Sequence, residues 1–393
     1  MELQKDNSKV IVAISMVKNE EDIIELFCRY TLAYCDKMLI IDDDSDDNTP
    51  SIIQSLVEEG LQIVLIKKEF SLGFYKFERI NELAMLSFEQ YEADLVIPID
   101  ADEFITTDQN YSVRQILEGL PDDIIYKFRW RTYVLTEEAI QKKGELFDRI
   151  EKYRPIELEK MTKIVISRRL LIDDGYIITL GQHHLLPSQG SPSRETIVSD
   201  SLVFAHFPIR SIAQINTKII VGWINYQCMP EDRAKSWHWP IMYESIKNCG
   251  GLSIKQAEKY SVFYSYFDDR TEINESNFHS KLTTNHIDLK HVLQADALPL
   301  KFTPPPEENE IKIGLILSHI EKMIKAFESE KSNMTKDFEI EKSKLVENFK
   351  TEKDKEIALT IDELKASNSW KVGRFVTSPV RILRQFVFRS LNS

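Results

Sequence analysis

The stretch Leu95-Val-Ile-Pro-Ile-Asp-Ala-Asp-Glu-Phe104 passes from five apolar residues directly into a group of carboxylates. A short continuous apolar run is typical of a strand that is buried on both faces of a sheet. Asp100 and Asp102, two positions apart where that strand ends, would repel each other unless a cation lay between them. Because magnesium and manganese prefer oxygen ligands, the spacing predicts a divalent metal ion at this pair. The alternative is a solvated turn that merely ends the strand.

Three further apolar runs precede this stretch, at residues 10–17, 37–41 and 62–66, and helical patterns separate them. Strands that alternate with helices at this spacing predict an α/β fold with a mostly parallel sheet, helices on both faces and right-handed connections. Ligands bind such sheets at the carboxyl ends of the strands. We therefore expect the functional residues where these runs end.

A second acidic stretch, residues 42–47, follows the strand predicted at residues 37–41. Its alternating aspartates resemble a calcium-binding loop at first sight. The EF-hand loop requires Gly at its sixth position and Glu at its twelfth, whereas this sequence has Asp47 and Ile53 there. Calcium binding of that kind is therefore excluded.

The composition limits the class of protein. The 393 residues carry 50 basic and 63 acidic side chains, and the net charge of −13 argues against general nucleic-acid binding. No apolar run approaches the roughly 20 residues that span a membrane, and the polar first residues contain no apolar signal core. The four cysteines form no CxxC pair, which is typical of reduced thiols. We therefore expect a cytoplasmic enzyme.

Three stretches at predicted strand ends carry a resemblance: Val17-Lys-Asn-Glu20, the acidic residues 42–47 and Asp100-Ala-Asp-Glu-Phe104. In this order and spacing they resemble the signatures of a family-2-like glycosyltransferase of the GT-A fold, in its bacterial branch with VKNE and DADEF motifs. The resemblance covers about residues 8–110, and extends more loosely to about residue 225. It implies a GT-A (Rossmann-like) fold and an inverting transfer of a sugar from a nucleotide-sugar donor, most often a UDP-sugar.

The resemblance also implies which residues contact the donor nucleotide and its diphosphate. These residues are Ser15, Asp42, Asp43, Arg79, Asp100 and Lys163. Asp43 matches the residue that accepts a hydrogen bond from the base, and Asp42 is its close competitor. Arg79 matches an arginine near the diphosphate. Asp100 and Asp102 match the DxD pair that holds Mn²⁺ or Mg²⁺, with Asp102 as the more direct ligand.

Two later stretches, residues 181–184 and 202–211, also resemble this branch. His206 is a candidate to complete the metal shell or to contact the diphosphate. The alternative is a hydrogen-bonded histidine of the core. The candidates to line the sugar site or to neutralise the diphosphate are His183, His184, Lys163, Arg129 and Arg131.

Inverting transfer requires a carboxylate that deprotonates the acceptor hydroxyl. The later acidic motif that usually supplies this base in the family is not evident in this sequence. Besides Asp102, the candidate catalytic carboxylates are Asp174 and Glu195, and the alternatives Asp173, Glu231 and Asp232 stay open. Glu103 is expected to support the metal-binding pair.

The C-terminal part has a different composition. Consecutive prolines near residue 304 mark a boundary, because they cannot continue a helix or a strand. We expect the following division: a catalytic domain at residues 1–302 (nucleotide-binding part 8–120, acceptor part 121–302), a linker at 303–310, a helical segment at 311–366 and a basic amphipathic tail at 367–393. A heptad-like apolar stripe in the helical segment predicts a coiled coil and a homo-oligomer, or else a single solvated helix.

The tail carries five basic residues and no acidic one from residue 370 onward, together with aromatic side chains. This composition predicts peripheral contact with an anionic membrane surface, or else packing on the protein's own domain. The tail also resembles one found on many bacterial surface-polysaccharide transferases. It implies a glycan or lipid-linked acceptor at the inner face of the cytoplasmic membrane.

These observations predict a metal-dependent glycosyltransferase that builds a bacterial surface glycan. A non-catalytic scaffold, which assembles a glycan-synthesis complex through its coiled coil, is the alternative from another class. A nucleotidyltransferase is disfavoured, because no glycine-rich basic phosphate loop follows the first predicted strand.

Overall fold

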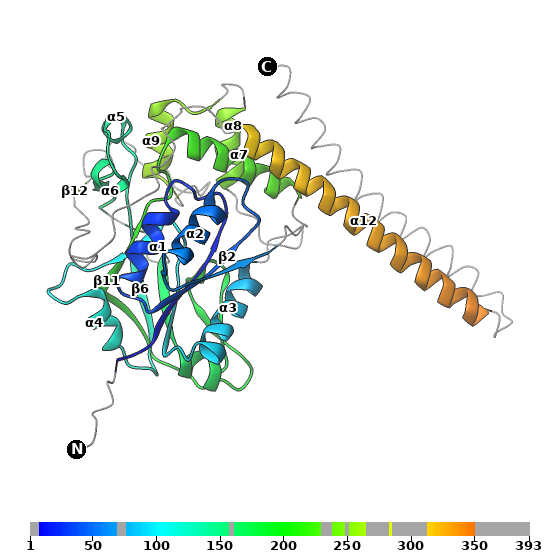
Figure 1. Ribbon diagram of the computed structural model, residues 1–393, viewed down its shortest axis with the longest axis horizontal. Helices are drawn as coiled ribbons and strands as arrows, with labels where there is room; N and C mark the ends of the chain where they lie inside the picture. Colours follow the sequence, from blue (N-terminus) through cyan, green and yellow to red (C-terminus); the bar gives the residue numbers. More distant parts are fainter. Residues whose placement is uncertain are drawn as a thin grey trace.

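The computed structural model describes residues 8–68, 76–155, 157, 161–228, 238–247, 251–264, 283–284 and 313–349. Most of these residues form one α/β unit, and a long C-terminal helix extends from it (Figure 1). Among the described helices, none combines the length and the apolar character needed to cross a membrane.

One eight-stranded sheet organises the α/β unit, in the order β3-β2-β1-β4-β8-β6-β11-β5. Its strands are β1 (Ile11–Val17), β2 (Lys37–Asp42), β3 (Ile63–Lys67), β4 (Leu95–Pro98), β5 (Glu103–Thr106), β6 (Ile125–Thr132), β8 (Thr162–Ser167) and β11 (Thr196–His206). The pairs β1–β2, β1–β4, β2–β3 and β6–β11 are parallel, whereas β4–β8, β6–β8 and β5–β11 are antiparallel. The predicted α/β class with a mostly parallel sheet is therefore confirmed.

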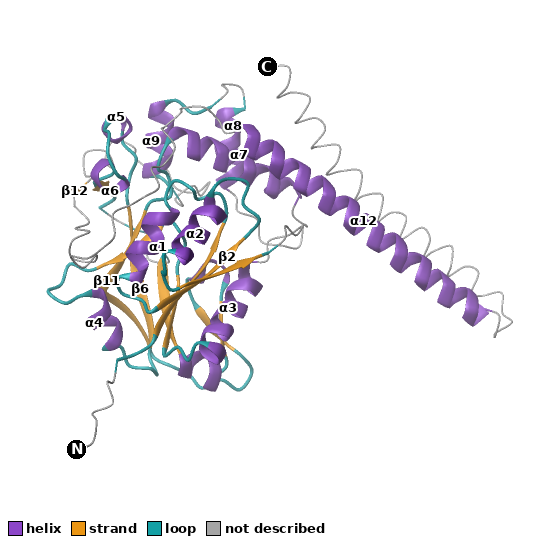
Figure 2. Ribbon diagram, viewed as in Figure 1, coloured by secondary structure: helices purple, strands orange, loops and turns teal. Residues whose placement is uncertain are grey.

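The first strand shows why this sheet is buried on both faces. Ile11 and Ala13 belong to one apolar cluster, and Val12 and Ile14 belong to the other. Successive side chains of a strand point to opposite faces, so each face of β1 needs an apolar cover. Helices α1 (Ile24–Leu32) and α2 (Thr49–Glu58) contribute to the first cluster, and α3 (Lys76–Gln90) contributes to the second (Figure 2).

Smaller elements complete the described part. They are α4 (Val113–Glu118), α5 (Glu137–Gln141), α6 (Leu146–Arg149), β7 (Lys152–Tyr153), a π-helical turn η1 (Arg169–Asp173), β9 (Tyr176–Ile178), a 3-10 turn η2 (Leu180–Gln182), β10 (Leu185–Pro187), α7 (Ile212–Cys228), α8 (His238–Ile246), α9 (Ile254–Val262), β12 (Thr283–Thr284) and α12 (Ile313–Phe349). Of these, α7 and α12 matter most for the site, because both reach its edge.

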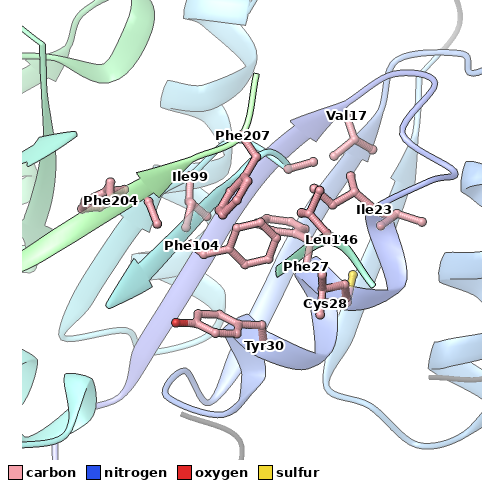
Figure 3. Close-up of a cluster of buried hydrophobic side chains, with 14 of the residues drawn as sticks. Val17, Ile23, Phe27, Cys28, Tyr30, Ile99, Phe104, Leu146, Phe204 and Phe207 are labelled. Carbon is pink, nitrogen blue, oxygen red and sulfur yellow. The ribbon is translucent and has the colours of Figure 1, made fainter. Parts of the chain in front are cut away.

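An aromatic cluster surrounds Phe104, which follows Asp102 by two positions in the sequence (Figure 3). Phe104 is fully buried at its centre and meets the rings of Tyr30, Phe147 and Phe207 edge to face, with centroids 5.1, 4.9 and 5.7 Å away. Phe27 contacts Phe104 in the same way at 6.4 Å. These contacts hold β5 in place, and they fix the backbone that carries the two aspartates.

The C-terminal helix α12 begins by packing on the α/β unit. Ile316, Ile320, Met323 and Phe327 recur every three or four residues, and all four are buried in the same cluster as α1 and α7. Beyond Phe327 the helix extends away from the unit (Figure 1). The predicted long C-terminal helix is therefore present over Ile313–Phe349.

Several predictions for the C-terminal part fall outside the described residues. These are the linker at 303–310, the end of the helical segment beyond residue 349 and the basic tail at 367–393. Coiled-coil pairing and membrane contact therefore stay predictions. The packing of α12 nevertheless shows that the first half of the helical segment is joined to the α/β unit by an apolar contact.

His319 is a buried titratable side chain at the contact between α12 and the α/β unit. It is fully buried, and its Nε2 lies 2.9 Å from Asn225 Oδ1 on α7. Burial, aided by Lys18 and Lys322 and opposed by Asp46, lowers the pKa of His319 to about 3. Because this pKa lies below that of an unfolded histidine, we expect the contribution of His319 to stability to be fully present above pH 6.5 and to be lost as the pH falls toward 3.

We expect the wild-type protein to lose more thermal stability between pH 7 and pH 5 than a His319→Gln variant, which has no imidazole to protonate. Differential scanning calorimetry at both pH values would measure this difference. An equal loss in the two proteins would show that His319 does not titrate in this way.

Candidate active site

The carboxyl ends of several strands bring the candidate residues to one edge of the sheet. Asp100 and Asp102 follow β4, and His206 ends β11. The backbone fixes their relation, because Phe207 N donates to Asp102 O at 2.8 Å and Tyr133 N donates to His206 O at 2.8 Å. The aspartate pair and the histidine, which lie about a hundred positions apart in the sequence, thus share one rigid frame.

Asp102 and His206 face each other across this frame. Asp102 Oδ2 lies 3.8 Å from His206 Nε2, and both residues are buried. Trp130 stacks on the imidazole, with ring centroids 4.2 Å apart. Burial lowers the pKa of His206 to about 3, so the ring is neutral and has a lone pair to donate. Burial opposes the ionisation of Asp102, but the positive charge of Lys218 outweighs it, and the pKa of Asp102 is lowered.

Asp100 is held by two lysines from different elements. Lys76 Nζ of α3 donates to Asp100 Oδ1 at 2.5 Å, and Lys163 Nζ of β8 donates to Oδ2 at 3.0 Å. Lys163 is completely buried, and its Nζ also lies 2.9 Å from Gln182 Oε1 and 3.1 Å from Glu103 Oε1. Lys163 therefore supports the carboxylates from behind, which differs from the diphosphate contact that the resemblance implies for it.

Glu103 shares this buried environment. It is fully buried, and its Oε2 accepts from the backbone N of Asp100 at 3.1 Å. Burial raises the pKa of Glu103 to about 8, although Lys163 opposes the shift. The residue supports the loop that carries the aspartates, as the sequence predicts.

Glu20 of the VKNE stretch, together with Asp22 just after it, fixes the chain that follows His206. Arg210 is almost fully buried and donates to Glu20 Oε2 at 2.5 Å and to Asp22 at 2.7 and 2.9 Å. Such bidentate pairing gives a fixed geometry. The motif at the end of β1 therefore positions the loop after β11, four residues from the histidine that faces Asp102.

Lys218 is the residue of this edge that sequence reasoning missed most clearly. It lies on α7, and its Nζ is 3.4 Å from Asp102 Oδ2. Tyr264 belongs to the same group of side chains, because its ring meets that of His206 with centroids 5.6 Å apart. Arg210 had a signal, the stretch 202–211, whereas Lys218 had none beyond its place on the following helix.

The loop after β2 forms the other side of the edge. Arg79 of α3 donates to Asp43 Oδ1, and Lys18 Nζ donates to Asp43 O at 2.9 Å. The two residues that the resemblance assigns to the base and to the diphosphate therefore contact each other. Burial raises the pKa of Asp43 against the effect of Lys18 and Arg79.

Two predicted nucleotide contacts in this region have polar atoms without partners. Among the described residues, neither Ser15 Oγ nor Asp42 Oδ1 has a hydrogen-bond partner, although both atoms are buried. A buried polar atom left unpaired is unfavourable, so such atoms indicate a place for a ligand or water. Asp42 Oδ2 accepts from Ser45 N at 3.2 Å and shapes the loop.

The helix α12 also reaches this loop. Lys322 Nζ lies 2.8 Å from Asp46 Oδ1 and 3.0 Å from Asp44 Oδ2, and it donates to Asp44 O at 2.7 Å. Ser318 donates to Asp46 as well. The acidic loop is therefore contacted both by Lys18, which follows β1, and by α12 near the C-terminal end of the described residues.

The carboxylates predicted as general bases lie at the opposite edge of the sheet. Asp174 accepts two hydrogen bonds from Arg194, at 2.7 and 2.8 Å. It follows the carboxyl end of β8, which pairs with the start of β4 and therefore lies at the other edge of the sheet. Glu195 O accepts from Ile125 N, where β6 and β11 begin. The structure does not bring Asp174 or Glu195 near Asp102, so we leave both out of the candidate site.

The remaining candidates from the sequence are engaged with protein groups. Arg129 lies 3.3 Å from Asp200, and Arg131 pairs with Asp108. Lys127 Nζ lies 2.7 Å from His184 Nδ1. His183 Nδ1 lies 2.7 Å from Thr162 O, and its ring meets Trp130 edge to face at 5.5 Å. His183 thus lies beside Trp130, the ring that stacks on His206.

The residues at this edge fit a divalent cation that takes few protein ligands. Asp102 supplies an ionised oxygen, and His206 supplies a neutral imidazole. Over the described ranges no three His, Cys, Asp or Glu side chains converge as a metal shell. Mg²⁺ and similar ions keep several waters and complete their shell with substrate phosphates, so two protein ligands are sufficient.

Comparison with known proteins gives partial likenesses of fold. No protein-family model and no curated protein sequence matches the chain. GalNAc-T7, solved with UDP, GalNAc and Mn²⁺, is 10% identical over 52% of this chain and 44% of its own, with a TM-score of 0.29. The mannosyltransferase PcManGT from Pyrobaculum calidifontis, in complex with GDP-Man and Mn²⁺, is 15% identical over 65% of this chain and 70% of its own, with a TM-score of 0.31.

HddC from Yersinia pseudotuberculosis is 11% identical over 50% of this chain and 94% of its own, with a TM-score of 0.29. This chain thus aligns with less than half the length of GalNAc-T7. At these identities and TM-scores the likenesses carry no argument about activity, which we derive from the geometry of the site.

Proposed function

We propose that this chain is a metal-dependent glycosyltransferase that transfers a sugar from a nucleotide-sugar donor with inversion. The observation that supports it best is the ionised Asp102 carboxylate facing the neutral His206 imidazole at 3.8 Å, at the carboxyl edge of an α/β sheet. This is the edge at which such sheets bind ligands. The sequence motifs that resemble family-2-like transferases end at the same edge.

The donor is proposed to lie along this edge. Its nucleotide would meet the unpaired Ser15 hydroxyl and the loop of Asp42 and Asp43, and its diphosphate would meet Asp102. When bound by Asp102 and His206, Mn²⁺ or Mg²⁺ supplies a Lewis acid that stabilises the departing nucleoside diphosphate. Lys163 holds Asp100 in place through a buried ion pair.

The proposed acceptor is a bacterial surface glycan or a lipid-linked precursor at the inner face of the cytoplasmic membrane. This part of the proposal is supported by the C-terminal sequence. A second candidate function is that of a non-catalytic scaffold. The way α12 extends from the α/β unit supports this candidate (Figure 1).

A panel of UDP-, GDP-, dTDP- and CMP-sugars, incubated with the full chain, tests the proposal. We expect slow release of one nucleotide in Mn²⁺ or Mg²⁺ and none in excess EDTA, measured by chromatography of the products. If no donor binds or is hydrolysed under either condition, the transferase proposal is wrong and the scaffold is favoured.

A further inference from the structure

The cation nearest to the proposed metal ligands belongs to the protein itself. Lys218 Nζ lies 3.4 Å from Asp102 Oδ2, and His206 Nε2 lies 3.8 Å from the same oxygen. An ammonium group and an imidazole thus converge on one carboxylate oxygen. The position beside that oxygen, which a metal ion would need, already holds a positive charge.

Lys218 is held less firmly than the two lysines on Asp100. Its side chain is 27% exposed, against 1% for Lys163 and 20% for Lys76. Its distance to the carboxylate, 3.4 Å, exceeds the 3.0 and 2.5 Å of the other two. A hydrogen bond of that length is weak, and a lysine side chain has a flexible stem. Of the three lysines, Lys218 therefore has the weakest contact with its aspartate.

The charges around Asp102 would change if Lys218 moved away from it. Asp102 is buried, so its carboxylate needs a compensating cation whether or not a metal ion is bound. A divalent ion on Asp102 and His206 would make the charge of Lys218 redundant there and repel it. A diphosphate, with its own negative charge, would then be the nearest partner for the released ammonium.

We propose that Lys218 occupies the place of the metal ion beside Asp102. When a divalent ion binds there, the ammonium group of Lys218 moves to the donor diphosphate. This inference rests on the proposed function. It makes the binding of metal and diphosphate mutually dependent: the ion alone must displace Lys218, and the diphosphate gives the displaced lysine a new partner. Such coupling acts equally in both directions.

A Lys218→Met variant separates the two roles, because methionine keeps an unbranched side chain without the charge. We expect the variant to bind Mn²⁺ alone about tenfold more tightly than wild type, and to bind the Mn²⁺–pyrophosphate complex about tenfold more weakly. Electron paramagnetic resonance of free Mn²⁺ measures the first affinity, and isothermal titration calorimetry with the preformed complex measures the second.

Two controls match this variant. Lys218→Arg keeps a positive charge and should stay close to wild type in both measurements. Lys9→Met removes a lysine that pairs with Asp122 at 2.7 Å, ahead of β1 and thus at the opposite edge of the sheet, and should change neither affinity. Thermal unfolding of each variant confirms that it is folded.

Each result decides the inference. Tighter Mn²⁺ binding with weaker binding of the pyrophosphate complex in Lys218→Met supports it. Unchanged or weaker Mn²⁺ binding, or no Mn²⁺ binding by wild type and variant alike, overturns it. An affinity for the pyrophosphate complex that rises as much as the affinity for Mn²⁺ alone overturns the transfer of charge to the diphosphate. None of these results decides whether the chain is a transferase, which the nucleotide-sugar panel tests independently.

Discussion

Asp102→Asn is expected to lower the metal-dependent release of nucleotide from the donor by about 10³-fold, because a Lewis acid contributes several kcal/mol to the stability of the transition state. The amide has nearly the same shape as the carboxylate, but it carries no negative charge for an ion. Initial rates at saturating Mn²⁺, with the donor selected from the panel, measure the effect.

The control for this variant is Asp122→Asn, which removes one carboxylate at the opposite edge of the sheet and should leave the rate unchanged. Mn²⁺ binding by Asp102→Asn should fall together with the rate. If Asp102→Asn releases nucleotide at the wild-type rate, Asp102 does not hold the metal ion.

Phe104→Ala is expected to lower the free energy of unfolding by about 3–5 kcal/mol. Phe104 is fully buried and meets four aromatic rings edge to face, so alanine would leave a cavity and remove all four contacts (Figure 3). Chemical denaturation followed by circular dichroism measures the loss.

Phe104→Leu is the matched control, because leucine retains most of the apolar volume but not the ring geometry. It should lose distinctly less stability than Phe104→Ala. Equal losses would show that the cavity contributes little and that the loss of the ring contacts accounts for the effect.

The sequence predicted the first half of the fold well, for a physical reason. The strands β1, β2 and β4 are buried on both faces and β3 is mostly half-buried, so each one appears as a continuous apolar run that needs no knowledge of its neighbours. β11 gave a weaker signal, because its first residues alternate between half-buried and exposed positions. Its place beside β5 and β6 depends on tertiary contacts.

The candidate site was predicted where the residues follow parallel strands. Asp100 and Asp102 lie at the expected edge because β4 is parallel to β1. Asp174 lies at the other edge because β8 runs antiparallel to β4, and a chain that leaves β8 therefore emerges at the opposite end. Strand direction is set by tertiary pairing, so the position of Asp174 could not be predicted from its distance along the sequence.

The basic residues at the site were the least predictable part. Lys218 lies on α7, and nothing in the local pattern distinguishes it from a solvated lysine, whereas Arg210 lies in the stretch 202–211 that carries part of the resemblance. Their burial and their pairing with Asp102, Glu20 and Asp22 arise only when β1, β4 and α7 are brought together.

The helix α12 projects from the α/β unit as a long rod (Figure 1). At 1.5 Å per residue, its 37 residues make a rod of about 55 Å, and roughly the last 33 Å project beyond Phe327. The near end of the rod touches the acidic loop through Lys322. A partner that held the far end would set the distance between its own surface and the candidate active site, and a tilt of the helix would move the residues that contact that loop.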